Sequence, residues 1–111
     1  MVAPKIKMKA ILHKEFGGPE VLGVTNDVEI PQIEKHEVLI QVHAAGINRP
    51  DILQRSGGYP PPPGASEILG LEVSGEIVDV GEDVNKNLLN TKVCALVPGG
   101  GYAEFVKCHT S

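Results

Sequence analysis

The chain has 111 residues, which is enough for one domain with a single core and too few for two. Ten basic and fourteen acidic residues give a net charge of −4, which argues against a nucleic-acid-binding protein. The chain has no run of about 18 apolar residues, so a membrane span is not expected. Two cysteines, Cys94 and Cys108, in a chain able to form a core favour free thiols in a reducing compartment, the cytoplasm.

β-branched residues set the expected fold class. Thirteen Val and nine Ile against only four aromatic residues favour strands over helices. In chain order, strands are expected at residues 7–13, 21–30, 37–47, 69–80, 93–97 and 102–108, with turns rich in Gly and Pro between them. The clearest of them is 37–47, where Val38, Ile40 and Val42 alternate with other residues. The sequence therefore predicts a mainly β domain, closer to a partly open barrel than to an alternating β-α-β sheet.

One segment, residues 48–55, changes character and predicts a short helix. Asn48 can cap its N-terminus, and the carboxylate of Asp51 lies where negative charge favours a helix start. A glycine pair ends the helix, and Tyr59 and a stiff run of four prolines follow. An amide and a phenol can orient a carbonyl group and support negative charge on its oxygen. Taken alone, however, the same residues also describe an ordinary capped turn with a packed tyrosine.

Metal and phosphate sites are not expected from the residues. The four histidines lack the spacings that metal ligands require. The glycines at 99–101 precede a strand-like stretch rather than a helix, so a hairpin turn is favoured over a phosphate loop. Neither GxGxxG nor GxxxxGK[ST] occurs, so the chain has no recognisable nucleotide site of its own.

Four segments in the same order resemble a known family. They are MKAILHKEFGGPEVL, AAGINRPDILQRSGGYPPPPGAS, ILGLEVSGEIVDVGEDV and LVPGGGYAEFV. Together they resemble the N-terminal, GroES-like domain of zinc-free medium-chain dehydrogenase/reductases, in the zeta-crystallin-like quinone oxidoreductase branch. Within that branch the likeness is greatest to the stress-inducible (p53-inducible) enzymes.

The resemblance implies a GroES-like partly open barrel over residues 1–111, with one or two short helices. In such enzymes a Rossmann domain follows and binds most of the NADPH, and the active cleft lies between the two domains. The Rossmann domain is absent from this chain, so we expect the chain to be inactive alone. We also expect the chain to stop before the C-terminal end of its GroES-like domain. The implied activity is hydride transfer from NADPH to a quinone or another electron-poor small molecule, by a homodimer or homotetramer at full length.

Other functions remain open on the sequence. An NADPH-dependent enone or enoyl reductase, which reduces a conjugated double bond, is the alternative within enzymes. A co-chaperonin-like module shares the fold, and a purely structural role, as in lens crystallins, is a third possibility.

The resemblance also assigns roles to residues. Asn48 takes the place of an active-site asparagine near the nicotinamide, which makes it a catalytic and cofactor-binding candidate. Asp51 supports the cleft by hydrogen bonding, and Tyr59 lines the quinone pocket as a catalytic hydrogen-bond donor. Leu53 stands where a second tyrosine is common, which implies a less polar pocket.

Departures from related patterns point to a zinc-free protein. Zinc alcohol dehydrogenases have Cys at the place of Asn48 and His-Glu at the place of Leu71-Glu72, so neither catalytic zinc ligand is present. The family usually has Gly-Asp-Arg-Val where this chain has Asn-Thr-Lys-Val at residues 90–93. We therefore expect the turn to differ there and to lose its glycine geometry.

Overall fold

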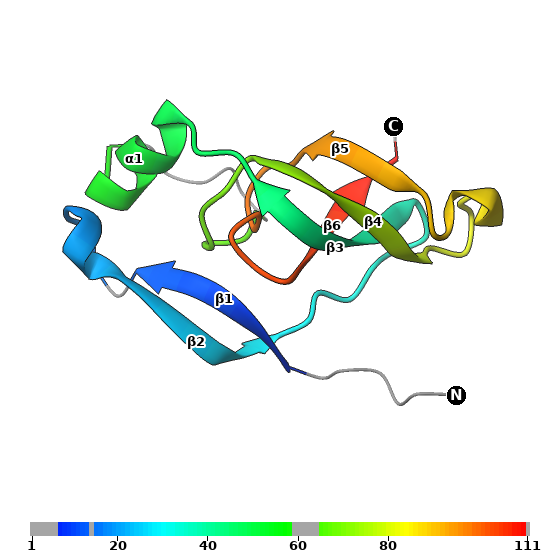
Figure 1. Cartoon of the computed structure of the whole chain (residues 1–111), viewed down its shortest axis with the longest axis horizontal. Helices are drawn as coiled ribbons and strands as arrows, with labels where there is room; N and C mark the ends of the chain where they lie inside the picture. Colours follow the sequence, from blue (N-terminus) through cyan, green and yellow to red (C-terminus); the bar gives the residue numbers. More distant parts are fainter. Residues whose placement is uncertain (1–6, 14, 59–64, 111) are drawn as a thin grey trace.

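The computed structural model describes residues 7–13, 15–58 and 65–110, which form two antiparallel sheets (Figure 1). The smaller sheet pairs β1 (Lys7–His13) with β2 (Leu22–Glu29). The larger sheet has the order β5-β4-β3-β6 and contains β3 (Glu37–Ala45), β4 (Glu72–Val80), β5 (Lys92–Leu96) and β6 (Phe105–His109). The helical elements are α1 (Arg49–Ser56) and the 3-10 turns η1 (Pro19–Val21) and η2 (Lys86–Leu88). No helix in these three ranges is long and apolar enough to cross a membrane.

The two sheets are joined where β1 meets the segment before β6. Ala10 and Ala103 form an isolated antiparallel bridge, and the Ile11 N–H donates to the Tyr102 carbonyl oxygen at 2.9 Å. In Figure 1 the β1–β2 ribbon lies beneath the larger sheet, with α1 at one end. The described strands form no closed ring, so the expected mainly β, partly open barrel is confirmed.

The main core lies on the inner face of the larger sheet, where alternate residues of β3 and β4 point inward. Its buried members are Val38, Ile40, Val73, Ile77, Val84, Val97 and Val106. Gly75, on β4, lies so close to β3 that a Cβ atom would stand 2.1 Å from the Gln41 carbonyl oxygen. A glycine in the interior of this strand therefore lets the two backbones approach at an irregular point of the ladder.

Two strands start three residues later than the sequence predicts. β4 begins at Glu72 rather than at residue 69 because Gly70 has a φ of +106° and interrupts the extended chain. β6 begins at Phe105 rather than at residue 102 because the backbone of Tyr102 hydrogen-bonds to segments other than β3. Its N–H donates to the Leu69 carbonyl oxygen at 2.9 Å, while its own carbonyl accepts from β1.

The turn before β5 keeps the geometry that we expected it to lose. Asn90 has a φ of +66°, in the left-handed region, and its N–H donates to the Ile77 carbonyl oxygen at 2.8 Å. The expectation of a lost glycine geometry is therefore wrong. The physical reason is that asparagine tolerates the left-handed conformation better than other residues with a side chain.

Replacing Asn90 tests this explanation. We expect Asn90→Val to lower the free energy of unfolding by about 1 to 3 kcal/mol, because a β-branched residue is strained at positive φ. We expect Asn90→Gly to cause no loss. Urea denaturation measures both, and Asn87→Val, an exposed position without positive φ, is the matched control. Equal losses for Asn90→Val and Asn87→Val would contradict the explanation.

Candidate functional site

Helix α1 begins and ends where local chemistry requires. Asn48 is its N-cap, with extended backbone angles of φ −127° and ψ 159°. Gly57 ends it with a φ of +93°, which residues with a Cβ rarely adopt. Reciprocal bonds tie the last turn to the loop before η1: the Gly17 N–H donates to the Arg55 carbonyl oxygen at 2.9 Å, and Arg55 Nε donates to the Gly17 carbonyl oxygen at 3.1 Å. The C-terminal end of the helix is thus held by the loop that connects β1 to η1.

Asp51 holds the N-terminal end of the helix from inside the protein. The residue is 2 % exposed, and its Oδ2 accepts the Asn48 N–H at 3.0 Å. The same oxygen accepts the hydroxyl of Tyr102 at 2.6 Å. Its other oxygen, Oδ1, is buried and has no hydrogen-bond partner in the part of the chain that the structure describes. Oδ2 of Asp51 thus accepts hydrogen bonds from the helix cap and from a distant tyrosine, while its role in supporting a cleft stays a prediction.

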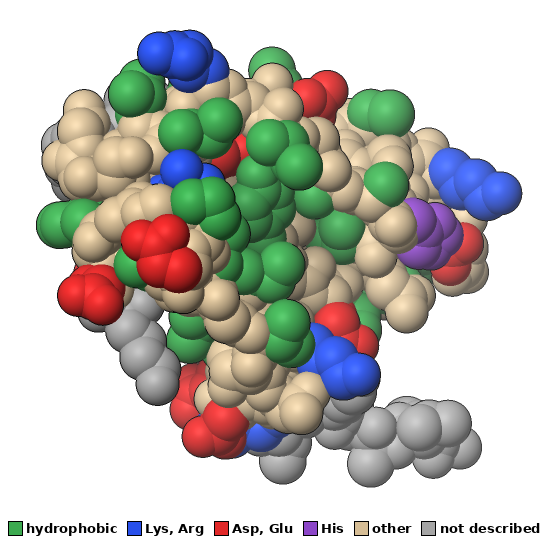
Figure 2. Space-filling view, turned by 60° about the vertical axis from the view of Figure 1, so that its left-hand side comes forward, with side chains coloured by type: hydrophobic (Ala, Val, Ile, Leu, Met, Phe, Trp, Pro, Cys, Tyr) green, Lys and Arg blue, Asp and Glu red, His purple; other side chains and the backbone are tan. Residues whose placement is uncertain are grey.

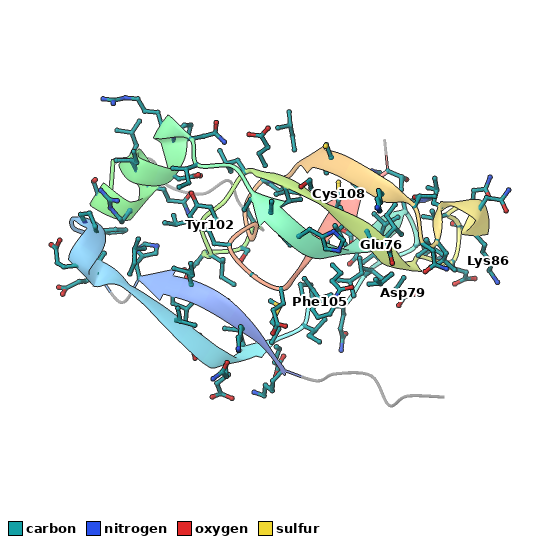
Figure 3. All side chains as sticks on the ribbon, viewed as in Figure 1. Glu76, Asp79, Lys86, Tyr102, Phe105 and Cys108 are labelled. Carbon is teal, nitrogen blue, oxygen red and sulfur yellow. The ribbon has the colours of Figure 1, made fainter. Side chains whose placement is uncertain are left out.

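Tyr102 is a site residue that the sequence analysis missed. Its phenol lies between α1 and the β1–β2 sheet (Figure 3). Burial, and then the hydrogen bond to Asp51, raises the pKa of the Tyr102 phenol well above its ordinary value near 10. The signal that could have indicated a special position is the glycine run before it, because such runs often mark a close backbone approach. Indeed, a Cβ atom on Gly101, the last glycine of that run, would stand 3.0 Å from Gly70 backbone atoms.

Asn48 also makes a side-chain contact that the sequence analysis did not anticipate. Its Nδ2 donates to Glu72 Oε1, at the start of β4, at 3.2 Å. Gly46 provides the space for this contact, because a Cβ atom there would stand 2.6 Å from the same carboxylate oxygen. The amide of Asn48 is therefore oriented by a carboxylate from another strand.

Exposed apolar side chains belong to the elements that carry this amide–carboxylate pair or to neighbouring strands. Ile47 precedes Asn48, and Leu96 is the β5 partner of Glu72; each is 80 % exposed. Ile52 and Leu53, on α1, are also exposed. Figure 2, in which the α1 end is turned forward, shows hydrophobic side chains gathered in a band across this face. The elements that carry the amide–carboxylate pair therefore also present exposed apolar side chains.

The structure brings together only part of the expected site. Asn48, Asp51 and Leu53 all belong to α1 or its cap, with Leu53 exposed on the helix and Asp51 buried beneath it. Tyr59 lies outside the described residues, so its place beside Asn48 stays a prediction.

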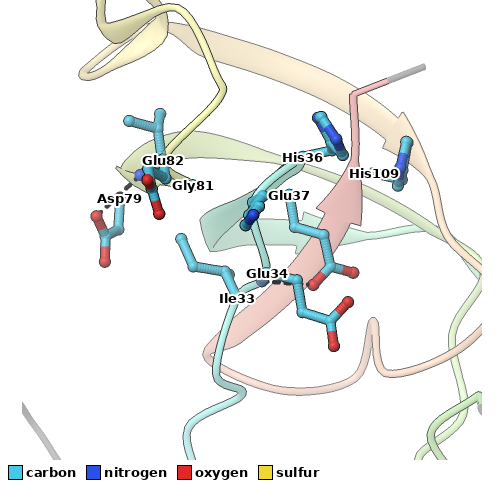
Figure 4. Close-up of a pocket in the computed structure, with 10 residues that line it drawn as sticks. Ile33, Glu34, His36, Glu37, Asp79, Gly81, Glu82 and His109 are labelled. Atoms are coloured by element: carbon cyan, nitrogen blue, oxygen red, sulfur yellow. Dashed lines mark hydrogen bonds between the residues drawn. The ribbon is translucent and has the colours of Figure 1, made fainter.

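A hollow lined by charged residues lies at the N-terminal end of β3, away from α1 (Figure 4). It is lined by residues 33–37 and 79–82 and by His109. Within residues 7–13, 15–58 and 65–110, no three side chains of His, Cys, Asp or Glu are grouped so that they could hold a metal ion. The free thiols of Cys94 and Cys108 lie on β5 and β6, at opposite edges of the larger sheet.

The raised pKa of Tyr102 predicts a particular loss of stability at alkaline pH. A group whose pKa is raised by folding stabilises the folded state below its unfolded pKa of about 10, and this contribution falls as the pH rises further. We therefore expect the unfolding free energy of the wild type to fall more steeply above about pH 9 than that of Tyr102→Phe. Urea denaturation across this range measures it. Ser56→Ala, which removes a hydroxyl that does not titrate here, keeps the wild-type slope; parallel curves for wild type and Tyr102→Phe would contradict the prediction.

Comparison with known proteins places this geometry in a family. Residues 34–111 match the family described as the alcohol dehydrogenase GroES-like domain. The chain is 43% identical over 99 residues to the quinone oxidoreductase of Mus musculus and 44% identical to that of Lama guanicoe. Each match covers 88% of this chain and 30% of the relative, so the chain spans about a third of the length of these relatives.

Solved structures show the same fold. The quinone oxidoreductase of Coxiella burnetii superposes with a TM-score of 0.81 at 33% identity, covering 94% of this chain and 35% of that one. The human synaptic vesicle membrane protein VAT-1 homolog-like protein superposes with a TM-score of 0.84 at 28% identity, covering 95% of this chain and 33% of that one. The likeness to quinone oxidoreductases as a group is thus confirmed, whereas the narrower likeness to stress-inducible members stays a prediction. The chain belongs to the family of alcohol dehydrogenase GroES-like domains.

Proposed function

We propose that the chain is the substrate-side domain of an NADPH-dependent quinone oxidoreductase, whose nicotinamide-binding domain lies outside it. The observation that carries the proposal is the Asn48 amide, oriented by Glu72 at 3.2 Å on a face rimmed by exposed apolar side chains. Relatives named quinone oxidoreductase at 43% and 44% identity support it. The proposal includes a cytoplasmic enzyme that works as a homodimer or homotetramer.

The residues of this face suit one end of the cofactor. A nicotinamide ring is flat and carries a neutral carboxamide, which matches an uncharged amide flanked by apolar surface such as Ile47 and Leu96. The diphosphate end would need a glycine-rich loop before a helix, and the sequence has no such motif. The chain would therefore hold the nicotinamide and leave the remainder of NADPH to the other domain.

Bound NADPH supplies the hydride, and the side chains of this domain orient the reactants. The Asn48 Nδ2 carries two N–H groups; Glu72 accepts one, and among the described residues no other acceptor is bonded to it, so the second is proposed to bind a ligand. Tyr59 is proposed to donate a hydrogen bond to the quinone carbonyl oxygen, where negative charge develops as hydride arrives. Leu53, 38 % exposed, contributes apolar surface to the quinone pocket.

The choice of substrate separates the proposal from its alternative, an enone or enoyl reductase. We expect the complete enzyme to reduce an ortho-quinone such as 9,10-phenanthrenequinone with at least about tenfold higher kcat/KM than an alkenal such as 2-hexenal. Oxidation of NADPH, followed by its absorbance, measures both, and NADH is the matched control for cofactor choice. A preference for the alkenal would replace the quinone reductase with the alternative, and activity toward neither would contradict both.

Substitutions at Tyr59 and Asn48 separate the two proposed roles. Tyr59→Phe removes a donor to a developing oxyanion and should lower quinone turnover by about 10- to 100-fold, with little change in NADPH affinity. Asn48→Ala should lower kcat/KM by a similar factor and also weaken NADPH binding, measured by fluorescence titration. Asn87→Ala, an exposed asparagine at η2, is the control. Unchanged turnover in Tyr59→Phe would remove that phenol from the mechanism.

A further inference from the structure

Tyr102 holds one of the two bonds that compensate the burial of Asp51. A buried carboxylate is costly unless hydrogen bonds replace its hydration. In the described part of the chain, Oδ1 of Asp51 has no partner, so compensation falls on the two donors at Oδ2. One is the Asn48 N–H at 3.0 Å, and the other is the Tyr102 hydroxyl at 2.6 Å. The carboxylate is therefore placed jointly by the cap of α1 and by a residue 51 positions away.

The backbone of Tyr102 is bonded to β1 and to the segment before β4, and only its side chain reaches the helix. Its N–H donates to the Leu69 carbonyl oxygen at 2.9 Å, and its carbonyl oxygen accepts the Ile11 N–H at 2.9 Å. The next residue, Ala103, forms the bridge that joins the two sheets. Bonds on both sides of the residue fix its backbone, so the phenol is a fixed point against which the helix start can be set.

Asn48, by contrast, has few restraints of its own. It is half-buried and caps a helix of eight residues. Its side-chain contact with Glu72 is exposed, and exposed polar contacts restrain a side chain weakly. The partly buried bond from its N–H to Asp51, a residue that is itself buried, is therefore its firmest restraint outside the helix backbone.

We propose that Tyr102 is a positioning residue: through the Asp51 carboxylate it sets the place and orientation of Asn48. Its relevance to catalysis rests on the proposed function, in which Asn48 contacts the nicotinamide. Displacements of about 1 Å at a reacting centre can cost about 100-fold in rate, so even a loosened helix cap lowers turnover.

Hydrogen exchange of the chain itself tests the positioning without any assay of activity. In Tyr102→Phe we expect the Asn48 amide to exchange about tenfold faster or more, because a hydrogen bond to a charged group is lost from the site that restrains it. The Ile77 amide of β4, which donates to the Thr91 carbonyl oxygen just before β5, should keep its wild-type rate. Ser56→Ala, a hydroxyl deletion on the exposed side of α1, should change neither rate.

Substitutions of Asp51 complete the test. Asp51→Asn keeps an oxygen that can accept both bonds, so it should preserve most of the protection of Asn48. Asp51→Leu should reproduce the fast exchange of Tyr102→Phe. An unchanged Asn48 rate in Tyr102→Phe, or equal acceleration at Asn48 and Ile77, would overturn the proposal.

Kinetics of the complete enzyme connect the positioning to catalysis. We expect Tyr102→Phe to lower kcat for quinone about 10- to 100-fold while the KM for quinone stays within about twofold, because the pocket persists and only alignment is lost. If Tyr102→Phe leaves kcat unchanged but speeds exchange at Asn48, the residue positions Asn48 but this positioning does not matter for catalysis. A wild-type enzyme that reduces no quinone contradicts the proposed function, whereas the exchange result still decides the role of Tyr102.

Discussion

A single buried carboxylate connects the short helix of this domain to both of its sheets. Asp51 lies at the third position of α1, and its Oδ2 accepts one bond from the helix cap and one from Tyr102. Tyr102 is in turn bonded to β1 and to the segment before β4. Because an unpaired buried carboxylate costs several kcal/mol, both donors must stay in place for the charge to remain inside. The position of the candidate site is thus coupled to the join between the sheets.

Close backbone contacts make this coupling possible. Gly101 lies against Gly70, such that a Cβ atom on Gly101 would stand 3.0 Å from Gly70 backbone atoms. The Tyr102 main chain can therefore reach Leu69, and its phenol can extend toward α1. Gly46 has a similar function on the other side of the site, where it leaves room for the Glu72 carboxylate beside Asn48. Small residues at these points allow polar side chains from distant segments to meet.

The sequence predicts the elements better than it predicts their contacts. Alternation of β-branched residues indicates β3 correctly, and the cap residues indicate the start of α1 within one position. The starts of β4 and β6 are predicted wrongly because Gly70 turns the chain and Tyr102 hydrogen-bonds to other segments. No local sequence pattern indicates such distant partners. The same limit applies to the site: a capping role for Asp51 is a local property, whereas its bond to Tyr102 spans 51 positions. Asn90 shows the converse, because an asparagine there adopts the left-handed conformation that we expected the turn to lose without a glycine.

The two side-chain carboxylates bonded to Asn48 have different tasks. The contact between Asn48 and Glu72 is exposed, and contacts of that kind contribute at most about 1 kcal/mol. Such a contact can select which way an amide faces, but it cannot hold the backbone that carries the amide. That second task falls to Asp51, where burial makes each hydrogen bond stronger and its loss more costly. Orientation and position are therefore supplied by two different carboxylates bonded to the same asparagine, Glu72 exposed and Asp51 buried.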